Sequence, residues 1–186
     1  MKKTVLTFGL ISAVVTSVMM LLTVPFMDRI GFEHGQVFGY TAIVLSFLLV
    51  FFGVRSYREN VGGGVLTFGR GFTVGLLITL LSCAGYVLTW QLIYFKLSPG
   101  FMDKYKTYAV EKARASGASE STVQETARQM DSFKKLYDQP LFNAAVTFLE
   151  PFPIGLVVTL ISAAVLRKRE PAAAVRSRSD PGLTTV

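Results

Sequence analysis

Hydrophobic residues are gathered along the chain into four long blocks, which are separated by two short links and one long link. A helix that crosses the roughly 30 Å hydrocarbon core of a bilayer needs about 20 apolar residues. The blocks that approach or exceed this length are residues 4–27, 37–54, 72–95 and 141–166. None of them shows the alternating polarity of a barrel strand. The pattern therefore predicts an all-α integral membrane bundle of four transmembrane helices.

The first block, residues 4–27, follows two lysines, as the apolar part of a secretory signal peptide would. It is too long for that role and lacks a small-x-small cleavage site before Asp28. We expect it to remain as the first span of a membrane domain, residues 1–169. The polar remainder, residues 170–186, is predicted to be a disordered cytoplasmic tail.

The positions of lysine and arginine predict the orientation of the spans, because basic links favour the cytoplasmic side. Ten basic residues fall at the N-terminus, between the second and third spans, and after the fourth: Lys2, Lys3, Arg55, Arg58, Arg70, Arg167, Lys168, Arg169, Arg176 and Arg178. We therefore expect both termini to be cytoplasmic and the protein to reside in an inner (cytoplasmic) membrane. The long link, counted from Lys96 to Pro140, has eight basic and six acidic residues and would face outward, which weakens the asymmetry.

Composition agrees with a membrane protein, since 51% of the residues are hydrophobic and only 17% are charged. The net charge of +7 equals the excess on the proposed inner face, so anionic lipid is the expected partner there and nucleic acid is not needed. The single cysteine, Cys83, and the single histidine, His34, cannot supply a disulfide or a zinc site. No nucleophile has a matching base, so we expect no enzyme activity, cofactor or metal.

The long link, residues 97–140, has a helical pattern of its own. Ser98-Pro99-Gly100 ends the third helix, and apolar residues then recur at steps of three and four: Phe101, Met102, Tyr105, Tyr108, Ala109 and Ala113. After Gly117, a second helix is predicted to start at Ser121, with Gln124 completing a capping box. We expect an amphipathic helical insert that lies on the membrane or caps the bundle as a lid. Alternatively, it is a platform for an envelope protein partner.

Small residues at four-residue steps predict where the spans pack, because they let helix backbones approach closely in lipid. The clearest stripe is in the third span: Gly71, Gly75, Thr79 and Cys83. Similar stripes are Gly9, Ala13 and Ser17 in the first span and Gly155, Thr159 and Ala163 in the fourth. One such stripe could instead form the face of a homo-oligomer.

The fourth span carries a carboxylate and two prolines, Glu150, Pro151 and Pro153, within an apolar run. Proline lacks a backbone N–H donor, so the helix is predicted to kink or restart there. Glu150 can be structural, starting the second helix at the positive end of its dipole. Alternatively, it is an intramembrane ion or proton site. Its candidate polar neighbours are Thr89, Gln91, Asn143 and Thr147.

Two segments carry a family resemblance. LTFGRGFTVGLLITLLSCAGYVL, residues 66–88, contains Phe-Gly-x-Gly-Phe-x-x-Gly at the start of the third span, and FLEPFPIGLVVTLISAAVLRKR, residues 148–169, contains Glu-x-x-Pro-x-Gly. The second motif consists of Glu150, Pro153 and Gly155, to which Pro151 is an addition. With the four spans and the insert before the last, residues 4–169 resemble the bacterial membrane proteins grouped as domain of unknown function 4199. The resemblance implies an envelope context and no catalytic residue.

From these patterns we expect a multi-pass membrane protein with a structural or interaction role in the cell envelope. Its contact sites would be the insert and the surface of the bundle, with Glu150, Pro151, Pro153 and Gly155 as a structural or functional hub. The alternative is a small transporter or channel component centred on Glu150. An enzyme that acts on lipid is a distant third class.

Overall fold

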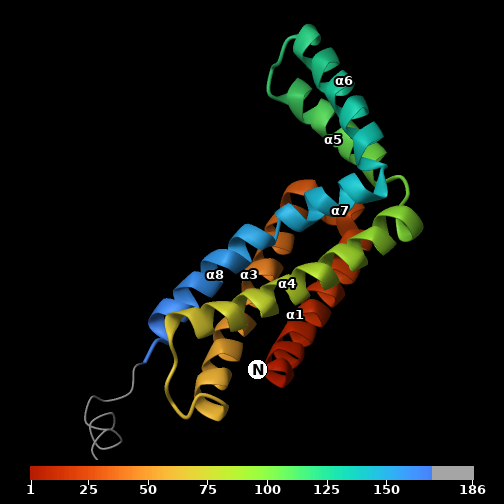
Figure 1. The fold of residues 1–186 in the computed structure, drawn as a ribbon. Coiled ribbons are helices and arrows are strands. Elements are labelled where there is room, and N and C mark those ends of the chain that lie inside the picture. The colour runs from red at the N-terminus through yellow and green to blue at the C-terminus, as the bar shows by residue number, and fades with distance from the viewer. Residues whose placement is uncertain (169–186) are drawn as a thin grey trace, which may run out of the picture.

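The computed structural model describes residues 1–168, and this part of the chain is helical throughout (Figure 1). Within it no strand is formed, apart from an isolated β-bridge between Leu66 and Lys168. The predicted all-α architecture is therefore confirmed. The predicted tail, residues 170–186, lies outside the described residues, as do Arg169, Arg176 and Arg178 of the basic set.

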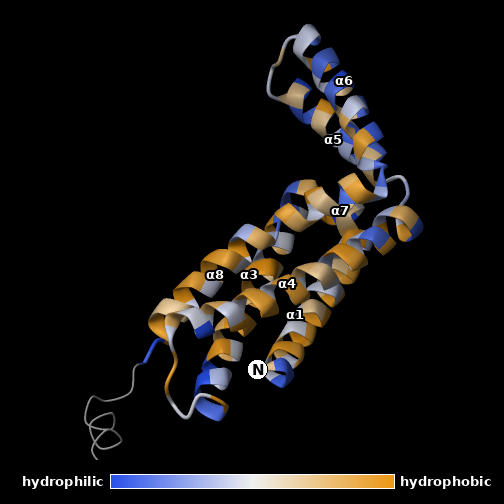
Figure 2. Cartoon of the chain, viewed as in Figure 1, coloured by the Kyte–Doolittle hydropathy of each residue, from blue (hydrophilic) through white to orange (hydrophobic). Residues whose placement is uncertain are grey.

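The helices follow one another in this order: α1 Lys2–Thr23, η1 Val24–Phe26, α2 Met27–Ile30, α3 Phe32–Asn60, α4 Phe68–Leu92, η2 Ile93–Leu97, α5 Phe101–Ala115, α6 Glu120–Tyr137, α7 Pro140–Leu149 and α8 Phe152–Val165. η1 is a short 3-10 helix, and η2 is a π-helical turn that continues α4. Four continuous segments of the described chain are long and apolar enough to cross a membrane: Lys2–Phe26, Phe32–Asn60, Phe68–Leu97 and Pro140–Val165. Their apolar colouring contrasts with the polar ends and with α5 and α6 (Figure 2).

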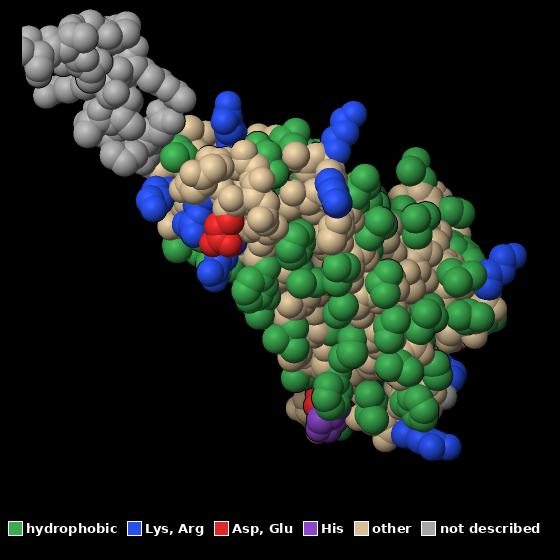
Figure 3. Space-filling view, turned by 90° about the horizontal axis from the view of Figure 1, so that it is seen from below, with side chains coloured by type: hydrophobic (Ala, Val, Ile, Leu, Met, Phe, Trp, Pro, Cys, Tyr) green, Lys and Arg blue, Asp and Glu red, His purple; other side chains and the backbone are tan. Residues whose placement is uncertain are grey.

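The four long segments pack against one another around α3 and α4. α4 contacts α1, α3, α7 and α8, while α3 also contacts α1 and α8. Their shared core holds Phe47, Val50 and Val54 of α3 against Val74 and Ile78 of α4. Many other large hydrophobic side chains point outward, and they cover the middle of the face in Figure 3, with lysine and arginine nearer its edges. An apolar exterior of this size suits contact with lipid.

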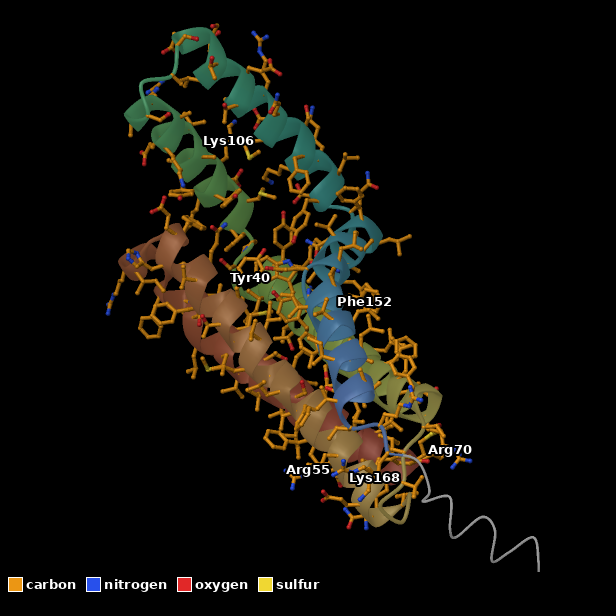
Figure 4. All side chains as sticks on the ribbon, turned by 90° about the vertical axis from the view of Figure 1, so that its left-hand side faces the viewer. Tyr40, Arg55, Arg70, Lys106, Phe152 and Lys168 are labelled. Carbon is orange, nitrogen blue, oxygen red and sulfur yellow. The ribbon has the colours of Figure 1, made fainter. Side chains whose placement is uncertain are left out.

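The two ends of the molecule differ in charge and in structure. At one end, which we call the basic end, the backbone of Leu66 and Lys168 exchanges two hydrogen bonds of 2.8 and 2.9 Å. These bonds tie the link between α3 and α4 to the end of α8. Figure 4 shows Arg55, Arg70 and Lys168 at this end and Lys106, on α5, at the opposite one, which we call the hairpin end.

The link between the first two spans is shorter than the hydrophobic pattern suggests. Only Gly31 separates α2 from α3. Gly31 has a φ of 78°, which a glycine adopts without steric cost. Glu33 therefore lies in the first turn of α3 and not in a loop. The helix dipole favours a carboxylate in the first turn.

α5 and α6 form an antiparallel hairpin that projects from the rest of the chain (Figure 1). The turn passes through Gly117, which has a φ of 78°. α6 begins at Glu120, where the Ser119 side chain accepts a hydrogen bond from the Thr122 backbone. The predicted cap, Ser121, is two residues too late, because three hydroxyl residues at 119, 121 and 122 offer competing caps.

Candidate functional site

The fourth span is interrupted at Glu150 and Pro151. α7 ends at Leu149, and α8 begins at Phe152 with prolines on both sides of its first residue. Neither proline has a backbone N–H to give to the carbonyls of α7, so the helical hydrogen-bond ladder cannot run through this point. The first bond of the new helix runs from the Gly155 N–H to the Pro151 carbonyl at 3.0 Å. Pro151 is buried in the resulting break, whereas Pro153 is exposed.

The Glu150 side chain is held by a hydrogen bond from a residue of α4. The Tyr86 hydroxyl donates a hydrogen bond of 2.8 Å to Glu150 Oε2. Glu150 Oε1 accepts no hydrogen bond, and the carboxylate bonds no backbone N–H of α8, among the described residues. The geometry therefore differs from the structural interpretation in which Glu150 caps α8.

A cavity of about 280 Å³ lies beside this carboxylate, toward the hairpin end. Its wall is shared by α1, η1, α2, α3, α4 and α7, and α5 and α6 contribute residues from the hairpin. The cavity is close to the small end of the roughly 300 to 1,000 Å³ range typical of ligand sites. Glu150 lines it and is an exposed residue, so its accessible surface includes part of the cavity wall.

The cavity wall is mainly apolar and flexible, with a few polar groups. Four methionines contribute to it: Met19, Met20, Met27 and Met102. Aromatic rings come from α3, α4, α5 and α6, and the hydroxyls of Tyr86 and Tyr137 stand among them. Among the described residues that line the cavity, Glu150 is the only charged one. Unbranched thioether side chains adapt to ligands of irregular shape, so this wall suits a variable apolar body.

Glu150 lies deep within its span when the distance is taken along the helix. The span begins at Pro140, ten residues before Glu150. At 1.5 Å per residue, the carboxylate is roughly 15 Å from the hairpin end of the span. Tyr86 is eleven residues from the end of its own span at Leu97, which gives a similar depth. A carboxylate at such depth is costly and is expected to face a cavity or the protein interior.

The polar residues expected near Glu150 form hydrogen bonds with other residues and not with Glu150. Gln91 Nε2 donates to the Pro140 carbonyl at 2.9 Å and to Asn143 Oδ1 at 3.3 Å. Thr147 Oγ1 donates to the same Asn143 oxygen at 3.4 Å. The fourth expected neighbour, Thr89, pairs with Ser17 of α1 at 2.7 Å. These residues therefore join α1, α4 and α7, and the Glu150 carboxylate is left to Tyr86.

The base of the hairpin is fixed to α4 by two further bonds. The Trp90 indole donates to the Tyr137 hydroxyl at 2.9 Å, and the Tyr94 hydroxyl donates to Asp138 Oδ1 at 2.6 Å. Lys134 also donates to Asp138 at 3.0 Å. The Tyr94 bond, followed by the effects of Lys134, holds the pKa of the Asp138 carboxyl below its usual value, although burial opposes the shift.

The upper wall of the cavity is built where α5 meets the start of α3. The Phe32 ring lies 5.7, 5.5 and 5.1 Å from the ring centroids of Phe101, Tyr105 and Tyr108. Beyond the rings, Lys112 Nζ donates to Glu33 Oε1 at 2.6 Å. This hydrogen bond is the main cause that raises the pKa of Lys112, and the bond to Tyr108 and the negative charge of Glu33 add to it. The aromatic contacts hold α5 against α3 at the wall of the cavity.

The predicted packing residues Gly71, Gly75, Thr79 and Cys83 are all buried on α4. A Cβ atom on Gly71 would lie 3.3 Å from Ala163 Cα, and one on Gly75 would lie 2.9 Å from Thr159 Cγ2. Thr79 Oγ1 lies 3.0 Å from Thr159 Oγ1. This face of α4 is therefore occupied by α8 of the same chain. Self-association would need another surface.

The stripe predicted in the first span meets α4 from the other side. A Cβ atom on Gly9 would lie 2.7 Å from Leu81 Cδ2, and Ala13 Cβ would be 2.5 Å from a Cβ atom on Gly85. Gly155, in the predicted hub, faces Thr79 and Phe47. It contributes to helix packing and lies one turn beyond the break that holds Glu150.

Two features of the site have no clear signal in the sequence. Tyr86 is separated from Glu150 by 64 residues, and only its place in an aromatic series with Trp90 and Tyr94 marks it. The cavity depends on eight helical elements meeting at one end of the molecule. The apolar residues that line it are of the same types as residues that pack a core or face lipid, so they do not mark a cavity in the sequence.

The four apolar segments, their lipid-compatible exterior and the interrupted fourth span define a multi-pass helical protein of the kind that resides in membranes. The chain belongs to the family described as protein of unknown function (DUF4199), whose model matches residues 7–168. The resemblance seen in the sequence motifs is thus confirmed. No curated protein and no solved structure matches the chain.

Proposed function

We propose that this protein binds a small, mostly apolar molecule in the cavity beside Glu150, within the outer half of a bacterial inner membrane. The role is non-enzymatic, and it is the kind of role that a small transporter or channel component needs. In this proposal the basic end and both termini are cytoplasmic, with anionic lipid around them, and the hairpin end faces outward.

The observation that carries the proposal is the position of Glu150 on the wall of the cavity, with one oxygen held by Tyr86 and the other unbonded by the described residues. A carboxylate within a span costs several kcal/mol unless it has a partner or reaches water. A purely structural role would favour bonds to the backbone of α8, which the Glu150 side chain does not make.

The chain offers a built-in probe of the cavity. Trp90 is its only tryptophan, and the Trp90 side chain lines the cavity. Bromine quenches indole fluorescence at short range, so a brominated long-chain alcohol that enters the cavity should quench Trp90 saturably in purified protein reconstituted in nanodiscs. Linear quenching with no saturation would reflect dissolution in lipid alone and would contradict the proposal.

Gly39→Leu is the matched control, because it fills the site with little effect on packing. Gly39 lines the cavity, and a Cβ atom there would meet nothing within 4 Å. The variant should fold normally and leave only the linear quenching from lipid. Saturable quenching that survives in Gly39→Leu would place the ligand elsewhere.

A second candidate function is an interaction role for the insert, residues 97–140, as a structural component of the envelope. Its support is the charged outer surface of α5 and α6, which includes the exposed residues Glu111 and Arg114, and the fixed hairpin base. In this proposal the two helices are amphipathic, with the aromatic side of α5 toward the cavity. Crosslinking from Arg114 in intact cells would test it, and recovery of lipid alone would count against a protein partner.

A further inference from the structure

We propose that the ligand of this cavity is a lipophilic cation, in which an alkylammonium group pairs with Glu150 and an apolar body fills the methionine-lined space. This inference rests on the proposed function, because it names the class of molecule that the same site takes.

The charge of the site is the first argument. No lysine, arginine or histidine is found among the described residues that line the cavity, and no ion pair of the described residues includes Glu150. An ionised carboxylate in this apolar wall therefore lacks a counter-charge from the described residues. A cationic ligand provides it, whereas a fatty acid would bring a second negative charge to the same place.

The aromatic residues around the carboxylate are the second argument. The aromatic residues Tyr86, Trp90 and Tyr105 all line the same cavity as Glu150. Cations within about 6 Å of such rings are attracted by the ring quadrupole, most strongly when water is excluded. A cavity lined by aromatic rings and a single carboxylate is therefore a suitable site for an ammonium group.

The shape of the space is the third argument. The cavity is too small for a whole phospholipid, since about 280 Å³ is below the usual range for drug-sized ligands. Its methionines can rearrange around a flexible alkyl chain. The site thus fits the charged group and the adjoining alkyl chain of a free alkylamine, or only the ammonium group of a lipid headgroup.

The experiment compares three brominated compounds with the same alkyl chain and a different polar end: trimethylammonium, alcohol and carboxylate. Quenching of Trp90 is measured in nanodiscs of phosphatidylglycerol, which carries no ammonium group. The Gly39→Leu curve of each compound is subtracted to remove quenching from the lipid phase. The wild type should bind the ammonium compound at least tenfold more tightly than the alcohol, and the carboxylate least tightly.

Glu150→Gln keeps the shape and polarity of the side chain and removes its charge. In this variant the ammonium compound should lose its advantage and bind about as tightly as the alcohol. Glu150→Asp keeps the charge and should retain the preference, which guards against misfolding of a single variant. Equal binding of ammonium and alcohol in the wild type, or a preference that survives in Glu150→Gln, would overturn the inference.

The outcome distinguishes this inference from the proposed function. Saturable binding of all three compounds without preference would leave a binding site and remove its cation specificity. Absence of saturable binding by any of them would remove the proposed function as well. Adding phosphatidylethanolamine to the nanodiscs separates the two sources of the cation. If this lipid competes with the ammonium compound in the wild type and not in Glu150→Gln, the ligand is a lipid headgroup. If it does not compete in the wild type, the ligand is a free amine.

Discussion

Gly155 shows how much of the fold depends on the absence of one side-chain atom. A Cβ atom at this position would lie 2.5 Å from Thr79 Cγ2 and 2.8 Å from Phe47 Cε1. Both neighbours are buried, Thr79 on α4 and Phe47 on α3. Neither can move away without disturbing its own helix, because interiors are close-packed.

Gly155→Ala should therefore destabilise the protein by about 1 to 3 kcal/mol, even though alanine has the higher helix propensity. The free energy of unfolding, measured by denaturation in mixed micelles, checks this expectation. Gly69→Ala is the control, because a Cβ atom on Gly69 meets nothing within 4 Å, and it should cost nothing. Equal stability of the two variants would show that α8 does not pack on α4 and α3 as described.

Asp138 connects the hairpin base to α4 in a manner that depends on pH. Because the pKa of the Asp138 carboxyl is lowered by its bond from Tyr94, this contact contributes stability above the ordinary value of about 4. The contribution is lost as the pH falls through the lowered pKa of the folded protein. The carboxylate is 45% exposed, so solvent screening limits the contribution to about 1 kcal/mol or less.

Tyr94→Phe keeps the ring contacts and removes the hydroxyl donor. The variant should be less stable than the wild type at neutral pH, and the difference should shrink as the pH is lowered from about 6 to about 3. Thermal unfolding in detergent at several pH values measures this difference. A difference that stays constant over the range would show that Tyr94 acts through packing alone.

Residue-scale prediction from sequence succeeded where the cause is local. The break next to Glu150 follows from the covalent structure of Pro151, which removes a donor wherever the helix lies. The partner of Glu150 was not predicted, because the bond from Tyr86 depends on the rotation of α4 relative to a segment 64 residues away. Periodicity defines the faces of a helix and does not say which neighbour each face meets.

At the scale of the element, the hydrophobic blocks located the long helices and misjudged their ends. The second block, residues 37–54, lies within α3, which extends from Phe32 to Asn60. Arg55 and Glu59 continue this helix and pair at 2.9 Å on its exposed surface. A hydrophobic block marks the part of a helix that suits lipid, whereas polar residues continue the same backbone bonds into water.

Phe32 supplies the aromatic contacts between α3 and α5, beside the bond between Glu33 and Lys112. Its ring touches three aromatic side chains of α5, whereas the base of α6 is held separately by Trp90 and Tyr94. Phe32→Ala should therefore loosen α5 and leave the end of α6 in place. Hydrogen exchange should become at least several-fold faster in residues 101–115, with little change near Tyr137.

Phe38→Ala provides the control for this change, since Phe38 is on the same helix with 54% of its surface exposed. It should leave exchange in α5 unchanged. If exchange in α5 is insensitive to Phe32→Ala as well, the aromatic contacts of Phe32 do not hold α5 in place.

At the scale of the whole molecule, the separation of charge and apolar surface is what the sequence predicted best. Four apolar segments imply four membrane-compatible helices whatever their mutual packing. The cavity could not be predicted in this way, because residues of eight helical elements, including α5 and α6 of the hairpin, enclose it together. Such a space depends on crossing angles and not on composition.

The proposed orientation makes a prediction for the whole chain that its single cysteine makes easy to test. Cys83 is fully buried and should not react with a membrane-impermeant maleimide in a native membrane. A cysteine introduced for Ala115, at the tip of the hairpin, should be labelled from outside in intact spheroplasts, which lack the outer barrier. One introduced for Val61, which is 53% exposed in the link between α3 and α4, should be labelled only after the membrane is permeabilised. The reverse pattern would invert the protein and place the cavity in the cytoplasmic half of the bilayer, because the basic end and the hairpin end lie on opposite sides of the four spans (Figure 4).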